Sequence, residues 1–186
     1  MNVELILTKD GSHTLMRTDL DETYHSIHGA IQESCHVFVE NGLEYFAKKF
    51  KVKTINIFEL GFGTGLNALL SFEWTKCHEV LLNYCTSELY PISVKVIEEL
   101  NYVDLLDVEI KREFMRLHES TPGIWNELSP YFNFKLDVQN IMNSEISNEY
   151  FDVIFFDAFA PNKQPELWTK KMFHKMYQSL AVNGIL

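Results

Sequence analysis

The sequence predicts an α/β fold in which a mostly parallel sheet carries helices on both faces, and three observations support this prediction. Apolar runs of strand length alternate along the chain with segments whose apolar residues recur every three or four positions. The strongest of these runs, "TINIFEL" and "YFDVIFFDAF", are rich in β-branched and aromatic residues, as buried strands are. A glycine-rich turn also joins the first of these strands to the helix that follows. Strands alternating with helices indicate a doubly wound parallel sheet.

The N-terminal part predicts a hairpin and a helix. "VELILTKDGSHTLMR" alternates apolar and polar residues around Asp10 and Gly11, a pair that favours a tight hairpin turn. Apolar residues then line one side of a helix from about residue 30 to 49. We expect residues 1–50 to cover a core formed by residues 51–186, the two parts making a single domain.

The core segments follow in a regular order. They predict a strand at 54–60, a helix at 66–75, a strand at 79–89, a helix at 92–101, a helix at about 104–118, strands at 132–137 and 150–159, a helix at 165–180, and a last strand opened by "NGIL". Pro91 suits the first turn before the second of these helices. The segment "TPGIWNELSP" is predicted to be a loop.

Composition excludes several classes of protein. The three cysteines form no CxxC pair, so neither a disulfide framework nor a zinc site is indicated, and a reducing cytoplasm is the simplest location. The N-terminus does not resemble a signal peptide, and no apolar run approaches the ~20 residues that span a bilayer. The formal net charge of −10 argues against general binding of polyanions. A nucleic-acid partner would therefore need a local basic face.

The stretch "ELGFGTGLN" is the first candidate site. Gly61, Gly63 and Gly65 follow a strand, where glycine permits positive φ and lets a ligand approach the backbone. The spacing is GxGxG and no Lys-Ser or Lys-Thr pair follows, which disfavours a P-loop. Glu59 would repel a pyrophosphate but could pair with a cationic ligand. A tight turn without a ligand is the structural alternative.

Two further acids end predicted strands. Glu88 lies where a carboxylate accepts hydrogen bonds from ribose hydroxyls in such folds, although a solvated acid is the competing interpretation. Asp137 ends the strand "FNFKLD" and could meet an adenine amino group, or it could be solvated or cap a helix. Three acids around a glycine loop describe an adenosine ligand that carries positive charge and no phosphate. S-adenosyl-L-methionine fits this description.

The glycine stretch resembles motif I of class I S-adenosyl-L-methionine-dependent methyltransferases, and a second stretch narrows the resemblance. "FDVIFFDAFAPNKQPELWT" (151–169) is similar to the pattern D-G-F-A-P-x-K-x-P-x-x-W of the MnmC family of tRNA 5-methylaminomethyl-2-thiouridine methyltransferases. The matching residues are Asp157, Phe159, Ala160, Pro161, Lys163, Pro165 and Trp168. Ala158 departs from the pattern, which usually has glycine there. "YHSIHGAIQESCHVF" (24–38) is similar to the segment that precedes the first strand in the family, so the resemblance covers nearly the whole chain.

This resemblance implies a Rossmann-like fold and methylation of the 5-aminomethyl nitrogen on the wobble uridine of tRNA. Asp157 is the expected catalytic residue, and a structural Asp closing a turn is its alternative. The expected cofactor-binding residues are Tyr24, Glu33, Glu59, Gly61, Phe62, Gly63, Thr64, Gly65, Asn67, Glu88 and Asp137. Phe159, Pro161 and Lys163 are expected to bind the substrate, and loop packing is the alternative for Phe159 and Pro161. Without the resemblance, Glu33 would be interpreted as a solvated helix residue.

The expected partner is the anticodon stem-loop of tRNA, bound by a basic face. The candidate residues are Lys163, Lys170, Lys171, His174 and Lys175, with a second cluster at Lys48, Lys49, Lys51 and Lys53. A solvated helix face explains either cluster equally well. His25, His28 and His36 are expected to be helical surface residues, and no metal is expected. The family also occurs fused to a flavin-dependent oxidase that prepares the amine, and we expect another protein to perform that step here.

Class I methyltransferases usually have further C-terminal strands after the fifth strand, and because this sequence stops at "NGIL" we expect those strands to be missing. Two other functions remain open at this point. One is methylation of another small amine or a protein side chain, and the other is a non-catalytic module that binds the cofactor. An NAD-dependent enzyme is disfavoured by Glu59 and by the GxGxG spacing.

Overall fold

The computed structural model describes residues 2–186 and contains two sheets. The large sheet has the strand order β6-β7-β5-β4-β8-β9. Its strands are β4 (Thr54–Leu60), β5 (Leu81–Glu88), β6 (Asn126–Ser129), β7 (Phe132–Val138), β8 (Phe151–Phe156) and β9 (Leu180–Ile185). All neighbours pair in parallel except β6, which runs antiparallel to β7 at one edge. The predicted α/β fold with a mostly parallel sheet is confirmed.

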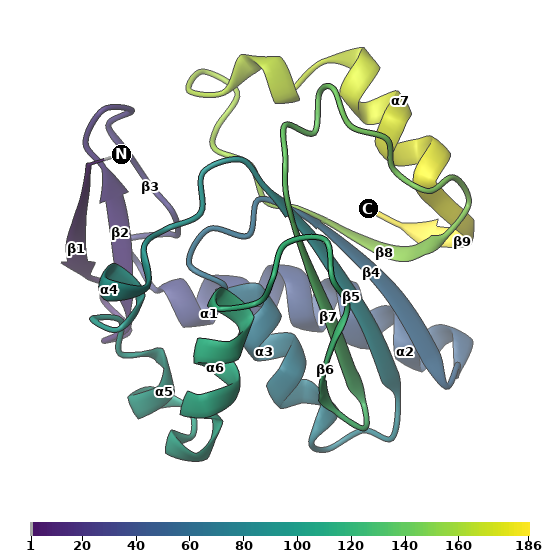
Figure 1. The fold of residues 1–186 in the computed structure, drawn as a ribbon, viewed down its shortest axis with the longest axis horizontal. Coiled ribbons are helices and arrows are strands. Elements are labelled where there is room, and N and C mark those ends of the chain that lie inside the picture. Colours follow the sequence, from purple (N-terminus) through teal and green to yellow (C-terminus); the bar gives the residue numbers. More distant parts are fainter. Residues whose placement is uncertain (1) are drawn as a thin grey trace.

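The small sheet has the order β1-β2-β3 and contains the predicted hairpin. Its strands are β1 (Val3–Leu7), β2 (His13–Arg17) and β3 (Glu22–Thr23), and all of them pair antiparallel. Figure 1 shows this sheet in purple at one end of the molecule, beside the large sheet. The two-residue β3 was not predicted, because so short a strand leaves no pattern in the sequence.

Helices cover both faces of the large sheet (Figure 1). The N-terminal helical run consists of α1 (Ala30–Ser34), a π-helical segment (Cys35–Glu44) and α2 (Tyr45–Phe50), and it packs together with α3 (Leu66–Thr75). This run confirms the predicted helix at 30–49. Gly42 lies where the run crosses β8, and a Cβ there would come within 2.9 Å of the Phe155 ring. The opposite face is covered by α7 (Lys170–Ser179), which follows a 3-10 turn at Pro165–Leu167.

Alternate residues of the central strands enter two separate cores. Ile57 of β4 belongs to a large cluster on the side of α3, while its neighbour Phe58 belongs to a cluster with Met172 and Met176 of α7. Both faces of β4 are therefore buried, as the continuous apolar run "TINIFEL" predicts. Among residues 2–186 no helix is long and apolar enough to span a membrane.

The predicted helices between β5 and β6 are the main error. The expected helix at 92–101 is reduced to α4 (Val94–Ile97), a short segment that contains three β-branched residues, which disfavour long helices. The expected helix at 104–118 is divided into α5 (Tyr102–Leu105), a 3-10 turn (Val108–Ile110) and α6 (Lys111–His118). Asp107 interrupts it, because its backbone is extended and its carboxylate accepts a hydrogen bond from the Glu109 N–H. The predicted loop 121–130 contains the edge strand β6.

Candidate active site

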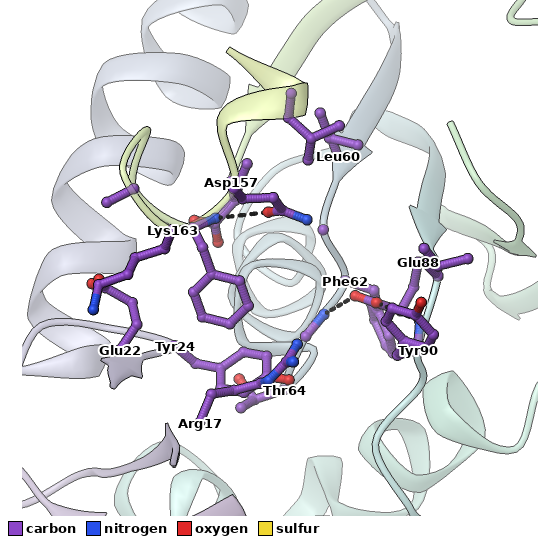
Figure 2. A pocket seen from close by; sticks show the side chains of 18 of the residues that line it. Arg17, Glu22, Tyr24, Leu60, Phe62, Thr64, Glu88, Tyr90, Asp157 and Lys163 are labelled. Atoms are coloured by element: carbon purple, nitrogen blue, oxygen red, sulfur yellow. Dashed lines mark hydrogen bonds between the residues drawn. The ribbon is translucent and has the colours of Figure 1, made fainter. Parts of the chain in front are cut away.

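The carboxyl ends of β4, β5 and β8 meet at a cavity of about 580 Å³. Its wall is formed by Arg17, Leu20 and residues 22–26 of the small sheet and the loops beside it, and by helical residues around Glu33 and Phe38. The glycine loop, residues 87–90 at the end of β5, residues 139–142 after β7, and parts of the segment from Asp157 to Leu167 complete it. Figure 2 shows Asp157, Glu88 and Tyr24 on different sides of this cavity. Segments far apart in the sequence thus form one site at the place where α/β sheets bind ligands.

The glycine loop between β4 and α3 has positive φ at all three glycines: 93° at Gly61, 51° at Gly63 and 75° at Gly65. A Cβ at Gly61 would collide with the carbonyl oxygen of Asp157, and one at Gly63 would come within 2.9 Å of the Tyr24 ring. Gly61 and Gly63 also line the cavity, whereas Gly65 is the N-cap of α3, and a Cβ there would come within 2.8 Å of His118 Nε2. Glycine is therefore required here by the close approach of other protein segments, in addition to any ligand.

Glu88 at the end of β5 is fixed by two backbone donors. Its Oε2 accepts a hydrogen bond from the Gly63 N–H at 3.1 Å, and its Oε1 accepts one from the Tyr90 N–H at 2.8 Å. Figure 2 draws the bond to the glycine loop. The half-buried carboxylate lies in the cavity wall, where its remaining lone pairs can accept hydrogen bonds from two adjacent hydroxyls.

Asp157 follows β8 and shares an amide donor with Glu59. The Nδ2 of Asn67 donates to Asp157 Oδ2 at 2.8 Å and to Glu59 Oε1 at 3.1 Å. Burial raises the pKa of Asp157 to about 7, with a smaller contribution from the charge of Glu33, while the bond from Asn67 opposes the shift. Burial and the neighbouring Asp157 raise the pKa of Glu59 to about 8. Asp157 and Asn67 line the cavity, but Glu59 lies behind them and is 0% exposed.

Glu33 forms another part of the wall. Its Oε2 accepts a hydrogen bond from the Ser26 N–H at 2.6 Å, which fixes the loop between β3 and α1 against the helix. Glu33 is also close enough to Asp157 for its charge to raise the pKa of that carboxyl. The two acids therefore create a negative region on one side of the cavity.

The segment from Asp157 to Trp168 is held together by its own side chains. The Trp168 indole N–H donates to the Phe159 carbonyl oxygen at 2.8 Å, and Gln164 Oε1 accepts from the Phe159 N–H at 3.3 Å. The backbone of Ala158 does not have a positive φ. Its backbone consequently does not require the glycine that the family pattern has at this position.

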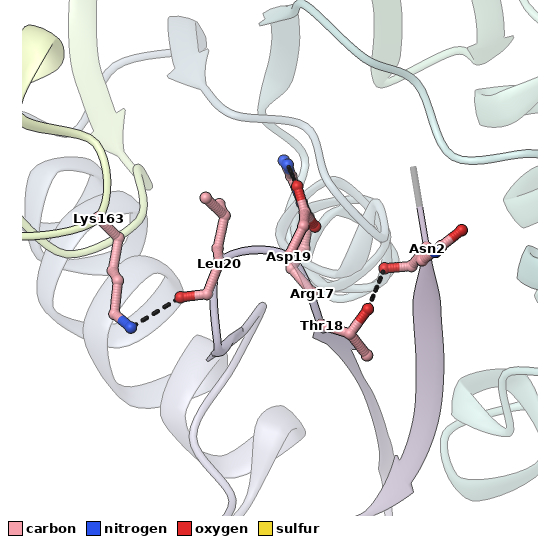
Figure 3. Close-up of polar contacts among 6 residues, drawn as sticks. All are labelled: Asn2, Arg17, Thr18, Asp19, Leu20 and Lys163. Carbon is pink, nitrogen blue, oxygen red and sulfur yellow. Dashed lines mark hydrogen bonds and ion pairs between the residues drawn. The ribbon is translucent and has the colours of Figure 1, made fainter.

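The small sheet is attached to this segment by aromatic and polar contacts. The rings of Tyr24 and Phe159 meet edge to face with their centroids 5.0 Å apart, and the Arg17 guanidinium lies 5.7 Å from the Phe159 centroid. The Lys163 ammonium donates to the carbonyl oxygen of Leu20 at 2.7 Å (Figure 3) and to that of Asp21 at 3.0 Å. Lys163 lines the cavity, but its ammonium group is bound to the small sheet. This arrangement does not favour the expected contact between Lys163 and the substrate.

Four expected site residues lie outside the cavity wall: Glu59 and Gly65, described above, and Asp137 and Pro161. The Asp137 carboxylate forms an ion pair with Lys135 at 2.8 Å and accepts a 3.5 Å hydrogen bond from the Cys85 thiol. Pro161 is exposed and does not line the cavity. The apolar side of the cavity is formed by Phe159 and Tyr24. The sequence analysis missed other residues of the wall, namely Arg17, Glu22, Tyr90 and the segment 139–142. They belong to a short strand and loops, where no motif or periodicity marks them.

Buried groups support the glycine loop from below. The Thr64 hydroxyl lies 3.3 Å from the Tyr102 hydroxyl, which donates to it, and 3.4 Å from His25 Nε2. Phe62 packs on the His118 ring with centroids 4.9 Å apart. The expectation that His25 lies on a helix surface is wrong, since it is buried in a loop and burial lowers its pKa to about 4.

The remaining histidines of that group do not approach one another as ligands would. His28 is exposed in a loop, and His36 lies on the helical run, where its Nδ1 is 3.0 Å from Glu40 Oε2. Within residues 2–186 no group of three or more His, Cys, Asp or Glu side chains could hold a metal ion.

The charges around the cavity are mainly negative. The acidic residues of its wall are Glu22, Glu33, Glu88, Asp157 and Glu166, and the lysine and arginine residues of its wall are Arg17 and Lys163. Such a wall favours a cationic ligand over a polyphosphate. The acids together with the adjacent glycine loop therefore suit a sulfonium nucleoside such as S-adenosyl-L-methionine.

The expected basic face is smaller than the sequence indicates. Lys163 is bound to the small sheet, and Lys175 donates to the carbonyl oxygens of Ile141 and Ser144, both at 2.5 Å. Lys170, Lys171 and His174 remain exposed on the same helix. Three of the five expected residues thus remain accessible to a phosphate.

Comparisons with known proteins agree with this geometry. Residues 126–186 match a family model described as S-adenosyl-L-methionine-dependent methyltransferase. A protein from Leptospira interrogans named tRNA 5-methylaminomethyl-2-thiouridine biosynthesis bifunctional protein MnmC is 30% identical, and the alignment covers 92% of this chain and 28% of that protein. The uncharacterized protein MJ0670 from Methanocaldococcus jannaschii is 27% identical over 98% of this chain and 49% of its own length. The chain thus spans less than half the length of these two relatives.

A solved structure of a similar protein has the same fold as this chain. The crystal structure of MNMC2 from Aquifex aeolicus superposes with a TM-score of 0.80 at 28% identity, covering 98% of this chain and 58% of that one. The similarity therefore includes the small sheet and the N-terminal helical run as well as the core.

Proposed function

We propose that this chain, because it is an MnmC-type methyltransferase domain, uses S-adenosyl-L-methionine to methylate the 5-aminomethyl group on the wobble uridine of tRNA. The product would be 5-methylaminomethyl-(2-thio)uridine. The observation that carries the proposal is the cavity at the ends of β4, β5 and β8, where the glycine loop and Glu88 lie on one side and Asp157 on another.

The glycine loop and the acids of the wall would hold the cofactor. Glu88, fixed by the N–H groups of Gly63 and Tyr90, would accept hydrogen bonds from the ribose hydroxyls. Gly61 and Gly63 leave the backbone open to the ligand, while Phe62 and Thr64 shape the loop from below. Glu33 would face the cationic methionine part. Once bound, S-adenosyl-L-methionine supplies an activated methyl group and leaves as S-adenosyl-L-homocysteine.

Asp157 would act on the substrate amine. An alkylammonium must lose a proton before its nitrogen can attack, and a carboxylate at hydrogen-bond distance can accept that proton and orient the lone pair. The pKa of about 7 allows Asp157 to hold or release a proton near neutral pH. The new bond forms between nitrogen and the methyl carbon as the carbon–sulfur bond breaks, so the protein mainly supplies alignment.

Phe159 and Tyr24 would receive the modified base. Their edge-to-face pair forms the apolar side of the cavity next to Asp157, and modifying enzymes commonly take the target nucleotide out of the base stack. The exposed Lys170, Lys171 and His174 would contact phosphates of the anticodon stem-loop. The proposal also requires a flavin-dependent enzyme that prepares the aminomethyl group, and both steps would occur in the cytoplasm.

The proposal is tested by methyl transfer from labelled S-adenosyl-L-methionine to tRNA that carries 5-aminomethyl-2-thiouridine. We expect the label in 5-methylaminomethyl-2-thiouridine after digestion to nucleosides. Asp157→Asn should lower kcat at least ~100-fold, because it removes the proton acceptor. Label that enters small amines or proteins but not tRNA would contradict the proposed substrate, and no transfer to any acceptor would contradict the proposed activity.

A further inference from the structure

Glu59 occupies an unexpected place for a residue that begins a glycine motif. Its side chain lies at the end of β4, is 0% exposed, and is separated from the cavity by Asn67. One carboxylate oxygen accepts the 3.1 Å bond from Asn67, and the other, Oε2, has no hydrogen-bond partner within the described residues. A cofactor in the cavity would therefore meet Asn67 and Asp157 before it could reach Glu59.

The groups around Glu59 explain which form of the acid is stable there. Tyr84 and Thr86 of β5 lie near its carboxyl without completing a hydrogen bond, and Asp157 adds a second acid beyond Asn67. None of the groups that shift its pKa is a cation. A buried carboxylate without a cationic partner is costly, so burial raises the pKa of Glu59 to about 8. The neutral acid is therefore the favoured form at any pH below that value.

The amide of Asn67 has a different relation to each acid. Its shorter bond, 2.8 Å, reaches Asp157 and lowers the pKa of that carboxyl against the effects of burial and of Glu33. Its longer bond reaches Glu59, and its own Oδ1 has no hydrogen-bond partner among residues 2–186. One donor group thus joins an acid on the cavity wall to an acid behind it.

We infer that Asn67 and Glu59 are positioning residues for Asp157 and that Glu59 is not a ligand of the cofactor. Asn67 holds the Asp157 carboxylate toward the cavity and stabilises its charged form. Glu59, while neutral, anchors the Asn67 amide from behind without placing a second negative charge on it. The protonation of the two acids is coupled through this amide. The inference rests on the proposed function only where it assigns Asp157 to the substrate amine.

The coupling is tested by following the Asp157 carboxyl with ¹³C NMR from pH 5 to 10, using Asp157→Asn to assign the signal. We expect Asn67→Ala to raise the pKa of Asp157 by about one unit or more, because a hydrogen bond to the charged form is lost. Glu59→Gln should convert a titration with two coupled steps into a single step. Ser71→Ala is the matched control, since this buried residue lies one turn further along α3.

Cofactor binding provides the second readout. Glu59→Gln should leave the dissociation constant for S-adenosyl-L-methionine within about threefold of the wild type, since the residue does not touch the cavity. An unchanged Asp157 titration in both variants, or a loss of affinity of ~30-fold or more in Glu59→Gln, would overturn the inference. Neither measurement needs tRNA, so failure of methyl transfer alone would count against the proposed function and not against this coupling.

Discussion

The backbone N–H of Gly63 donates to Glu88 Oε2 at 3.1 Å, so the glycine loop after β4 and the acid that ends β5 form one structural unit. The second oxygen of Glu88 is held by the Tyr90 N–H. The carboxylate therefore needs no rearrangement to accept hydrogen bonds from a ligand, which reduces the entropic cost of binding.

Glu88→Ala should weaken the binding of S-adenosyl-L-methionine by ~100-fold or more. The variant loses two hydrogen bonds between a charged acceptor and the ligand, each contributing about 1.5–3 kcal/mol. Calorimetric titration measures the change, with Glu98→Ala as a control for the loss of an exposed acid. An affinity equal to that of the control would show that Glu88 does not contact the ligand.

Gly63→Ala should weaken cofactor binding much more than Gly123→Ala. Both glycines have positive φ, so both substitutions introduce backbone strain of about 1 kcal/mol. Only at Gly63 would the new Cβ approach a ring, coming within 2.9 Å of Tyr24, whereas Gly123 has nothing within 4 Å. Equal effects of the two substitutions on affinity would contradict the contact between the loop and Tyr24.

Lys163→Met should loosen the small sheet and leave the salt dependence of tRNA binding unchanged. The ammonium holds the carbonyl oxygens of Leu20 and Asp21, so hydrogen exchange should accelerate in residues 18–24. Lys170→Met, which removes an exposed charge from α7, is the matched control for exchange. A decrease of about one in the salt slope for Lys163→Met, with no change in exchange, would instead identify a phosphate contact.

The free energy of unfolding should fall as the pH rises from about 6.5 to 8. Burial raises the pKa of Glu59 from 4.5 to about 8, so the folded state keeps a proton that the unfolded chain has released. Asp157 acts in the same direction up to about pH 7. His25 and His118, whose pKa values burial lowers to about 4, oppose this effect only below their unfolded value of 6.5.

The expected loss from Glu59 is about 2 kcal/mol over this interval, at ~1.4 kcal/mol per pH unit. Urea unfolding at pH 6.5 and 8 measures it. Glu59→Gln should remove most of the difference, because glutamine does not titrate. A stability that rises over the same interval, or an equal loss in the variant, would contradict the burial of a neutral acid at this position.

The parallel core could be predicted because its strands are apolar on both faces. Thr54–Leu60 and Leu66–Thr75 agree with the sequence to the residue, since a buried strand and a glycine-capped helix both leave strong local patterns. The region between β5 and β6 could not be predicted in the same way, because Asp107 interrupts a helical pattern through a capping bond of its own side chain. Local propensity does not show whether the continued helix or the cap at Asp107 is more stable.

The site was predicted in part for the same reason. Residues of the two motifs that stand out in the sequence, such as Gly61 and Gly63 of the first and Asp157 of the second, lie together on the cavity wall. The position of Glu59 behind Asn67 and the contact of Lys163 with the small sheet depend on side chains from distant segments. Asp137 was predicted to reach the ligand because it ends a strand. Its carboxylate instead pairs with Lys135 and does not line the cavity.

The most direct test of the central claim is a calorimetric titration of this chain with S-adenosyl-L-methionine, with NAD as the control ligand. We predict saturable binding of S-adenosyl-L-methionine alone, abolished or strongly weakened by Glu88→Ala. Binding of NAD in preference, or of neither ligand, would contradict the assignment of the cavity between the glycine loop, Glu88 and Asp157 as a methyl-donor site.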